Sequence, residues 1–262
     1  MPSNFSTPAI LIRRIGIGDS DLIVKLITLN KGKISVVAKS AKKSVKRFAG
    51  VLELFSALNI VYTISSRSTG IPILKEASVD KPFFKIRGDF KKTAYASYWS
   101  ELINEWIEEG EEKQGDVYSL LLYVLEELDR GIIPTESLSI FFQMRFMLIA
   151  GFGPNLRCCS FCKTEIDDIQ KNRILFSIVK GGIVCEKCRP ISFEHIYLSK
   201  GTIKQLQWVE NKDIKKAIRV RFTDSARQEG LRFLEMFVPY YIGKDIKSLK
   251  FLKEIRKNSL CH

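Results

Sequence analysis

The residues most able to do chemistry in this 262-residue chain are two pairs of cysteines in its second half. Each pair encloses two residues, and twenty-two residues separate the pairs. Two intervening residues let one tight turn direct both thiolates at a single ion, and two such turns supply the four tetrahedral ligands of a structural zinc site. We therefore predict one structural Zn²⁺ per chain, although a redox-active pair or buried free thiols would use the same residue type. The predicted ligands are Cys159, Cys162, Cys185 and Cys188.

The surroundings of these cysteines favour a closed structural site over a catalytic one. A catalytic zinc ion keeps one position for water and commonly has His or Glu ligands. His195 lies outside both pairs, and we interpret it as an ordinary core or surface residue. Cys158 is out of register and is expected to be a buried thiol, while Cys261 lies in a tail that we expect to fray. No catalytic residue is predicted, and a zinc-dependent nuclease or hydrolase is disfavoured.

The charge of the chain indicates a polyanionic partner. The 42 Lys and Arg residues exceed the 29 Asp and Glu residues and give a net charge of +13. Residues 1–80 carry +7 and residues 151–262 carry +10, whereas residues 81–150 carry −4. An excess of this size attracts nucleic acid, although an anionic membrane or solubility alone would explain the same total.

The sequence contains no targeting or membrane signal that we recognise. The first ten residues lack a cationic leader, and no apolar stretch is long enough to cross a bilayer. We therefore expect a cytoplasmic protein, in which cysteines are better explained as metal ligands than as disulfides.

Basic residues are concentrated between Asp21 and Glu53, an interval without an acidic residue. Cations along one barrel loop can follow the phosphates of a nucleic acid, and aromatic neighbours can stack on its bases. Phe48 and Tyr62 are candidates for such stacking, although each is better explained as core. We expect these cations to contact DNA rather than to form only a solvated face. Arg13 and Arg14, at the end of the first expected strand, extend this surface. We define the cationic strip as Arg13, Arg14, Lys31, Lys33, Lys39, Lys42, Lys43, Lys46 and Arg47.

A second basic cluster lies in the C-terminal part of the chain. For this cluster, DNA contact and a solvated face are equally open. Its members are Lys212, Lys215, Lys216, Arg219 and Arg221.

The first eighty residues have the pattern of short strands separated by turns. β-Branched residues are frequent, and Asn30, Lys31 and Gly32 are suited to a hairpin turn. Five strands in about 70 residues suggest a closed barrel of the OB-fold type, which often binds nucleic acid. The expected strands are 10–12, 22–29, 34–38, 58–64 and 71–74.

The remainder of the chain has helical periodicity. Tyr95, Tyr98, Trp99, Leu102 and Trp106 recur at spacings of three and four, so we interpret them as one apolar stripe of a core helix. The predicted fold class is α+β. An N-terminal five-stranded OB-fold barrel of residues 1–80 is followed by an α-helical domain of residues 81–262, with a four-cysteine zinc-knuckle insertion at 159–188. Further helices are expected at 120–128, 135–150, 202–210, 225–241 and 247–257.

Several segments on either side of the cysteine pairs resemble parts of one protein family. The sequence from Phe142 to Arg145, the glycine-rich segment 151–156 and the first cysteine pair together resemble the RecO family of bacterial DNA repair proteins. Phe176, the Gly-Gly step before the second pair, and segment 243–252 are similar to later parts of the same family. The resemblance covers nearly the whole chain. Lys163 departs from it, because the family usually has glycine there, which can alter this turn without removing a ligand.

This resemblance implies an N-terminal OB-fold followed by a helical domain with zinc knuckles. It also implies a recombination mediator, not an enzyme, which binds single- and double-stranded DNA and anneals complementary strands. Together with RecR, such a protein helps RecA to replace single-stranded DNA-binding protein, and it works in the cytoplasm at the nucleoid. An RNA-binding or transcription-associated zinc-ribbon protein would share the basic charge and both cysteine pairs, and it stays open as the alternative.

A further partner implied by the resemblance is the acidic C-terminal tail of single-stranded DNA-binding protein. Such a tail ends in apolar residues and a carboxylate, so its receptor needs a hydrophobic groove with a cation at the rim. We expect the helical domain rather than the barrel to hold this tail. The cation is expected to come from a local residue such as Arg130 or Arg145, or from the neighbouring basic part of the chain.

Overall fold

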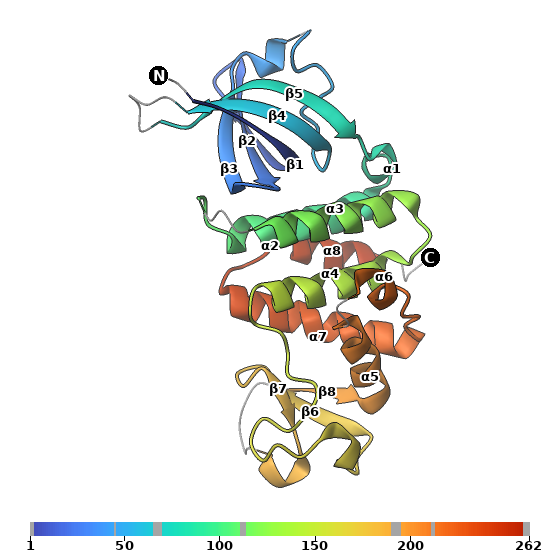
Figure 1. The fold of residues 1–262 in the computed structure, drawn as a ribbon. Coiled ribbons are helices and arrows are strands. Elements are labelled where there is room, and N and C mark those ends of the chain that lie inside the picture. The colour runs from blue at the N-terminus through green and yellow to red at the C-terminus, as the bar shows by residue number, and fades with distance from the viewer. Residues whose placement is uncertain are drawn as a thin grey trace. The chain divides into compact units, whose positions relative to one another are not determined.

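The computed structural model divides into two compact units (Figure 1). Unit 1 consists of Met1–Arg130 together with Ile246–His262, and unit 2 consists of Gly131–Asp245. The structure describes residues 3–44, 46–64, 70–110, 114–189, 195–210 and 213–258. Cys261 and Lys212 therefore lie outside the described residues, as do the side chains of His195 and Lys215.

Five strands of unit 1 close into a barrel in the order β1-β2-β3-β5-β4. Antiparallel pairing of β1 with β4 closes it, and β3 runs parallel to β5 where Val37 faces Ile73. The arrangement confirms the predicted five-stranded, OB-like barrel. The strands are β1 (Ser3–Ile17), β2 (Asp21–Thr28), β3 (Gly32–Ala38), β4 (Ala57–Ile64) and β5 (Ile73–Lys81).

The barrel is filled by the apolar residues that alternate along its strands. Leu26, Val36 and Leu74 are fully buried, and Phe48 and Leu52 from the β3–β4 connection add to the same core. Strand β1 is longer than the predicted 10–12, because the apolar run of its middle does not continue into its exposed ends, where Ile15 and Ile17 stand among polar residues and glycine.

The helices of unit 1 include one from the end of the chain. The carboxylate of Glu101 on α2 accepts the backbone N–H groups of Lys247, at 3.1 Å, and Ser248, at 2.7 Å. These bonds satisfy the free N–H groups at the start of α8 and fasten it to α2. The predicted stripe of α2 is core, since Tyr95, Tyr98 and Trp99 are fully buried. The helices are α1 (Phe84–Arg87), α2 (Phe90–Trp106), α3 (Gly115–Arg130) and α8 (Lys247–Asn258).

Polar contacts within unit 1 join the barrel to these helices. The ammonium of Lys33 donates a buried hydrogen bond of 2.7 Å to the carbonyl of Asn104, and Lys81 forms an ion pair with Glu126. The barrel and its neighbouring helices thus form one compact unit. The expected division into an OB-fold domain of residues 1–80 and a helical domain of residues 81–262 stays a prediction.

In its described residues, unit 2 combines four helices with a small antiparallel sheet of order β7-β6-β8. Phe176 of β6 is fully buried against Phe233 and Phe237 of α7, with ring centroids 4.6 and 5.5 Å apart. The helices are α4 (Thr135–Ile149), α5 (Lys200–Val209), α6 (Ile214–Ala217) and α7 (Asp224–Ile242). The strands are β6 (Arg173–Ser177), β7 (Gly182–Val184) and β8 (His195–Ser199), and the short 3₁₀ turns are η2 (Ile166–Asp168) and η3 (Glu186–Cys188).

The ends of α7 follow local chemistry. The hydroxyl of Thr223 accepts the N–H of Ala226 at 3.2 Å, so Thr223 caps the helix and the helix starts one residue before the expected 225. Gly243, with φ of 68°, ends it. Among the described residues, no helix combines the length and apolar character needed to cross a membrane.

Candidate metal centre and nucleic-acid interface

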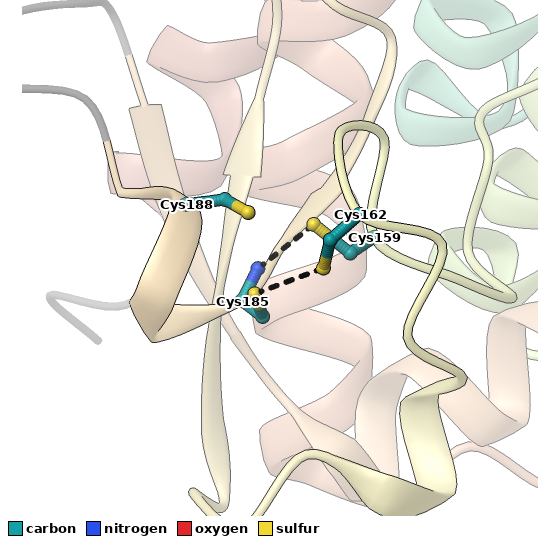
Figure 2. A group of neighbouring side chains, drawn as sticks. All are labelled: Cys159, Cys162, Cys185 and Cys188. Atoms are coloured by element: carbon teal, nitrogen blue, oxygen red, sulfur yellow. Dashed lines mark hydrogen bonds between the residues drawn. The ribbon is translucent and has the colours of Figure 1, made fainter.

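Two tight turns in unit 2 bring the four cysteines together (Figure 2). The first follows α4, where the carbonyl of Cys159 accepts the N–H of Lys163 at 3.0 Å. The second follows β7 and continues into η3, where the carbonyl of Cys185 accepts the N–H of Cys188 at 3.1 Å. Each turn therefore presents both of its sulfurs to the same point, as the spacing predicts.

The sulfur geometry fits a four-coordinate metal ion. All four Sγ atoms lie within 4.8 Å of one another, and those of Cys162 and Cys185 are 3.5 Å apart. A tetrahedron with Zn–S bonds of about 2.3 Å has sulfur–sulfur distances of about 3.8 Å. Cys159 and Cys185 are buried, whereas Cys162 is exposed. This donor set can hold a metal ion near the surface of unit 2.

Hydrogen bonds move the thiol pKa values in opposite directions. The hydroxyl of Thr164, 3.1 Å from the Sγ of Cys162, is the main cause that lowers the pKa of Cys162 to about 6. The hydrogen bond with Cys162 is in turn the main cause that raises the pKa of Cys188 to about 12. Sulfurs this close resist full ionisation, because each thiolate disfavours the next. A bound cation would remove that conflict by replacing the protons.

Backbone contacts lock the two turns against each other. Asn155 donates its N–H to Gly181 at 2.8 Å and accepts the N–H of Ile183 at 3.0 Å. Gly182 permits this approach, since a Cβ there would lie 2.3 Å from the Oγ of Ser160 and 3.1 Å from the carbonyl oxygen of Asn155. The position of the second cysteine pair thus depends on a residue without a side chain.

Cys158 lies next to this cluster without joining it. Its thiol is partly exposed, which corrects the expectation of a buried one. The backbone carbonyl of Cys158 accepts a hydrogen bond of 3.1 Å from the side-chain amide of Asn155.

The cationic strip is mostly exposed, as an interface with phosphates requires. Seven of its nine residues are exposed, on β1, at the end of β3 and in the β3–β4 connection around η1 (Ala41–Lys43). Lys31 is half-buried, with its ammonium 5.9 Å from the centre of the Phe5 ring. Lys33 is 6% exposed and bonded to Asn104, so it does not belong to the exposed strip. The expectation for Lys33 failed because the helices of unit 1 cover the start of β3.

Several cations of the strip are held in place by the barrel. The guanidinium of Arg47 stacks 4.4 Å from the centre of the Phe48 ring and donates to the carbonyl of Lys39 at 2.7 Å. The ammonium of Lys42 donates to the carbonyl of Gly18 at 2.7 Å. Arg14 pairs with Glu53 at 3.2 Å. Within the described ranges, four other members of the exposed strip have no ion-pair partner: Arg13, Lys39, Lys43 and Lys46.

The two aromatics considered as stacking platforms, Phe48 and Tyr62, are core residues of the barrel. Phe48 is 3% exposed and Tyr62 is 2% exposed, so both are core, the explanation that the sequence favoured. No local pattern indicated the role of Asp21, whose carboxylate accepts the N–H of Ser40 at 2.7 Å. This bond ties Ser40, at the start of the β3–β4 connection, to the first residue of β2.

Both halves of the chain match models of one protein family. Residues 1–83 match the model described as "Recombination protein O N terminal", and residues 87–250 match the model described as "Recombination protein O C terminal". The chain belongs to the RecO family. Membership supports a role in DNA repair and recombination, and it confirms the resemblance that the cysteine motifs indicated.

Full-length relatives of the RecO family agree with this assignment. The DNA repair protein RecO of Desulfosudis oleivorans is 46% identical over 256 residues, which cover 96% of this chain and 98% of the relative. That of Desulfatibacillum aliphaticivorans is 40% identical over 252 residues, covering 96% and 97%. That of Syntrophus aciditrophicus is 33% identical over 260 residues, covering 97% of each chain.

The departure from the usual RecO pattern leaves the first turn intact. Lys163 has φ of 63°, the left-handed conformation that glycine adopts easily and other residues rarely. Its N–H still bonds to Cys159, so the turn closes at a cost in backbone strain and both sulfurs keep their direction.

Proposed function

We propose that this protein is a non-enzymatic mediator of DNA repair and recombination that works in the cytoplasm at the nucleoid. It binds single- and double-stranded DNA, anneals complementary strands and, together with RecR, assists the loading of RecA. The observation that carries the proposal is the exposed cationic strip along one part of an OB-like barrel. Two DNA strands repel each other, and a surface that neutralises phosphates lowers this repulsion while leaving the bases free to pair.

In this proposal, the cations that hydrogen-bond to the barrel and the cations without an ion-pair partner have different roles. Arg47 and Lys42, fixed by the barrel, position the DNA backbone with little loss of side-chain freedom. Lys43 and Lys46, exposed on the same connection, follow the phosphates without reading sequence. Affinity should therefore depend on salt far more than on base composition.

We further propose that the metal held by Cys159, Cys162, Cys185 and Cys188 is Zn²⁺, one ion per chain. Four thiolates in tetrahedral reach are the preferred ligands of this ion, and such a set has no position left for a reacting water. Zinc would then stabilise the small sheet of unit 2, whose strands have three to five residues each.

A strand-annealing assay tests the mediator function. Complementary DNA strands are mixed with the purified chain, alongside an RNA-binding assay and a cleavage assay with added metal ions. Accelerated annealing without cleavage supports the proposal. Binding to RNA with no annealing of DNA would favour the RNA-binding or transcription-associated alternative, and cleavage would favour a hydrolase.

The proposed site for the tail of single-stranded DNA-binding protein lies on the helices of unit 1. Phe90 of α2 and Phe251 of α8 are 65% and 47% exposed, and their rings meet edge to face at 5.5 Å. On the neighbouring α1, the guanidinium of Arg87 lies 5.3 Å from the ring of Phe84, which is 71% exposed. Exposed aromatic rings can bind the apolar residues of such a tail, and a nearby guanidinium group can bind its terminal carboxylate. Arg87 is a better candidate cation than Arg130, because the charge of Arg130 is paired with Glu127 at 2.5 Å. The bonds of Arg87 go to uncharged oxygens of Leu54, Ser56 and Pro82.

Peptide titration tests this site. A labelled tail peptide is titrated onto the full chain and onto Phe90→Ala and Phe251→Ala variants, with Ile132→Ala as a matched change at a residue that is 81% exposed in unit 2. Each phenylalanine variant should weaken peptide binding, by about 1 kcal/mol or more if the residue is an anchor. Equal affinity of all variants would remove this surface from the proposal.

A further inference from the structure

Trp208 occupies a position that the packing of unit 2 does not explain. The buried residues of α5, which include Ile203, Leu206 and Val209, face the core of the unit. Trp208 falls on the other side of the helix and is 56% exposed, whereas Trp99 is fully buried. A tryptophan usually contributes to a fold through the large apolar area that it buries. An exposed indole therefore calls for an explanation other than stability.

The indole of Trp208 is held in a fixed orientation. Its Nε1–H donates to the carbonyl oxygen of Lys216 at 3.4 Å, and the same oxygen accepts the backbone N–H of Arg219 at 3.1 Å. A ring fixed at one edge presents its face with little loss of freedom when a ligand stacks on it. The same carbonyl also brings Arg219 into the immediate neighbourhood of the ring.

Two arginines lie in the segment that follows this contact. Arg219 and Arg221 are exposed, and neither has an ion-pair partner in the described part of the chain. The backbone N–H of Thr223 then donates to the side chain of Gln205 at 3.1 Å, which returns the segment to α5 one turn before Trp208. Arg219 and Arg221 therefore lie between two points at which the chain bonds to α5: Lys216, which bonds to Trp208, and Thr223, which bonds to Gln205.

The charge around Trp208 distinguishes this surface from a protein-docking patch. Residues 200–221 contain seven basic and two acidic side chains. Both acidic residues are matched with cations, since Glu210 lies 3.4 Å from Arg157 and Asp213 lies 4.0 Å from Lys216. Interfaces between proteins have apolar centres depleted in charge. One aromatic ring beside Arg219 and Arg221, which have no ion-pair partner in the described part of the chain, is instead the pattern of a surface that binds single-stranded nucleic acid.

We propose that Trp208, Arg219 and Arg221 form a contact site for single-stranded DNA in unit 2, distinct from the cationic strip of the barrel. The face of the indole stacks on one base, and the two guanidinium groups bind the adjoining phosphates. A duplex fits this site poorly, because its bases are already stacked on each other. The choice of DNA as the ligand rests on the proposed function. The exposure and orientation of the Trp208 ring are independent of that function.

Tryptophan emission gives a direct test in the full chain. Oligothymidylate is titrated into the wild-type protein while emission is recorded, and affinity is measured separately from the anisotropy of a labelled oligonucleotide. We expect the oligonucleotide to quench emission, and Trp208→Phe to abolish most of the quenching. Trp208→Ala should weaken binding by about 5- to 150-fold, whereas Tyr240→Ala, a matched change at an aromatic that is 47% exposed on α7, should leave it unchanged.

The same titration in a variant of the barrel separates this inference from the proposed function. In Lys42→Ala/Lys43→Ala/Lys46→Ala/Arg47→Ala, quenching of Trp208 should persist at higher oligonucleotide concentration. Unaltered affinity in that variant would count against the barrel site and leave the Trp208 site standing. Unquenched emission at saturation, wild-type affinity in Trp208→Ala, or equal quenching by a blunt duplex would each overturn the Trp208 site.

Discussion

The carboxylate of Asp21, the first residue of β2, accepts the backbone N–H of Ser40 at 2.7 Å and thereby joins β2 to the start of the β3–β4 connection. Ser40 has φ of 56°, a left-handed conformation that is costly for a residue with a side chain. The N–H of Lys42 donates to the carbonyl of Ser20 at 2.9 Å, so a second bond spans the same junction. These bonds order the start of the β3–β4 connection, which carries Lys42 and Lys43.

Removal of the Asp21 carboxylate should loosen this junction. In Asp21→Ala the Ser40 amide should exchange with solvent roughly tenfold faster, because one good hydrogen bond is removed. Asp21→Asn keeps an acceptor oxygen and is the matched control. Hydrogen exchange of the Ser40 amide, corrected for the intrinsic rate, measures the difference. Equal protection in the Ala and Asn variants would show that the bond does not order the strip.

The same junction should weaken in acid. The N–H of Ser40 is the main cause that holds the pKa of Asp21 below its ordinary 3.8, with the hydroxyl of Ser20 and nearby lysines acting in the same direction. A carboxyl group whose pKa is lowered by folding stabilises the fold above its unfolded pKa, and that contribution is lost as pH falls through the folded value. The Asp21 contribution is therefore complete at neutral pH and disappears only below about pH 4. A carboxyl resonance of Asp21 that titrates above 3.8 would contradict this.

The metal prediction concerns the cluster and its neighbour. The purified chain should contain about one zinc ion, and Cys159→Ser or Cys185→Ser should lose it and destabilise unit 2 by several kcal/mol, since structural zinc sites contribute on the order of 10 kcal/mol. Cys158→Ser should keep the ion, because Cys158 is not among the four clustered sulfurs. Elemental analysis and thermal unfolding measure both effects. A folded, metal-free wild-type protein would refute the zinc assignment.

Gly182 should be intolerant of even a methyl group. A Cβ at this position would overlap the Oγ of Ser160 and press on the backbone of Asn155. Gly182→Ala should therefore destabilise unit 2 by about 1–3 kcal/mol and weaken zinc retention. Gly201→Ala is the control, because nothing lies within 4 Å of a Cβ at that helical position. Denaturant unfolding of the two variants should separate them, and indistinguishable midpoints would show that the two turns do not need this close approach.

The cysteine turns and most elements were predictable because their signals are local. A CxxC spacing fixes the direction of two sulfurs within one turn, and the periodicity around Tyr98 and Trp99 repeats over a whole helix. The strands β6, β7 and β8 were not predicted, since segments of three to five residues carry too few side chains to show a period. The burial of Lys33 and the bond from Asp21 to Ser40 depend on chain segments brought together only by the fold.

Phe176 shows how the sheet beside the cysteine cluster depends on the helices of unit 2. Its ring is fully buried and contacts Phe233 and Phe237. Phe176→Ala should lower the free energy of unfolding by about 3–5 kcal/mol. Phe161→Ala, at a residue that is 46% exposed, should cost far less. Unfolding curves followed by circular dichroism test the comparison, and a similar loss of stability in both variants would contradict the packing described here.

The salt dependence of DNA binding tests the central claim, that the exposed strip of the barrel binds DNA through its phosphates. The affinity for single-stranded DNA is measured between 50 and about 300 mM salt for the wild type and for the Lys42, Lys43, Lys46 and Arg47 quadruple alanine variant. A second quadruple variant at exposed lysines of α8, Lys247, Lys250, Lys253 and Lys257, removes the same charge elsewhere.

The strip variant should bind all sequences more weakly, and its slope of log affinity against log salt should flatten by roughly 0.7 for each phosphate that it no longer neutralises. The α8 variant should keep the wild-type slope. A strip variant whose slope and affinity equal those of the wild type would contradict the claim.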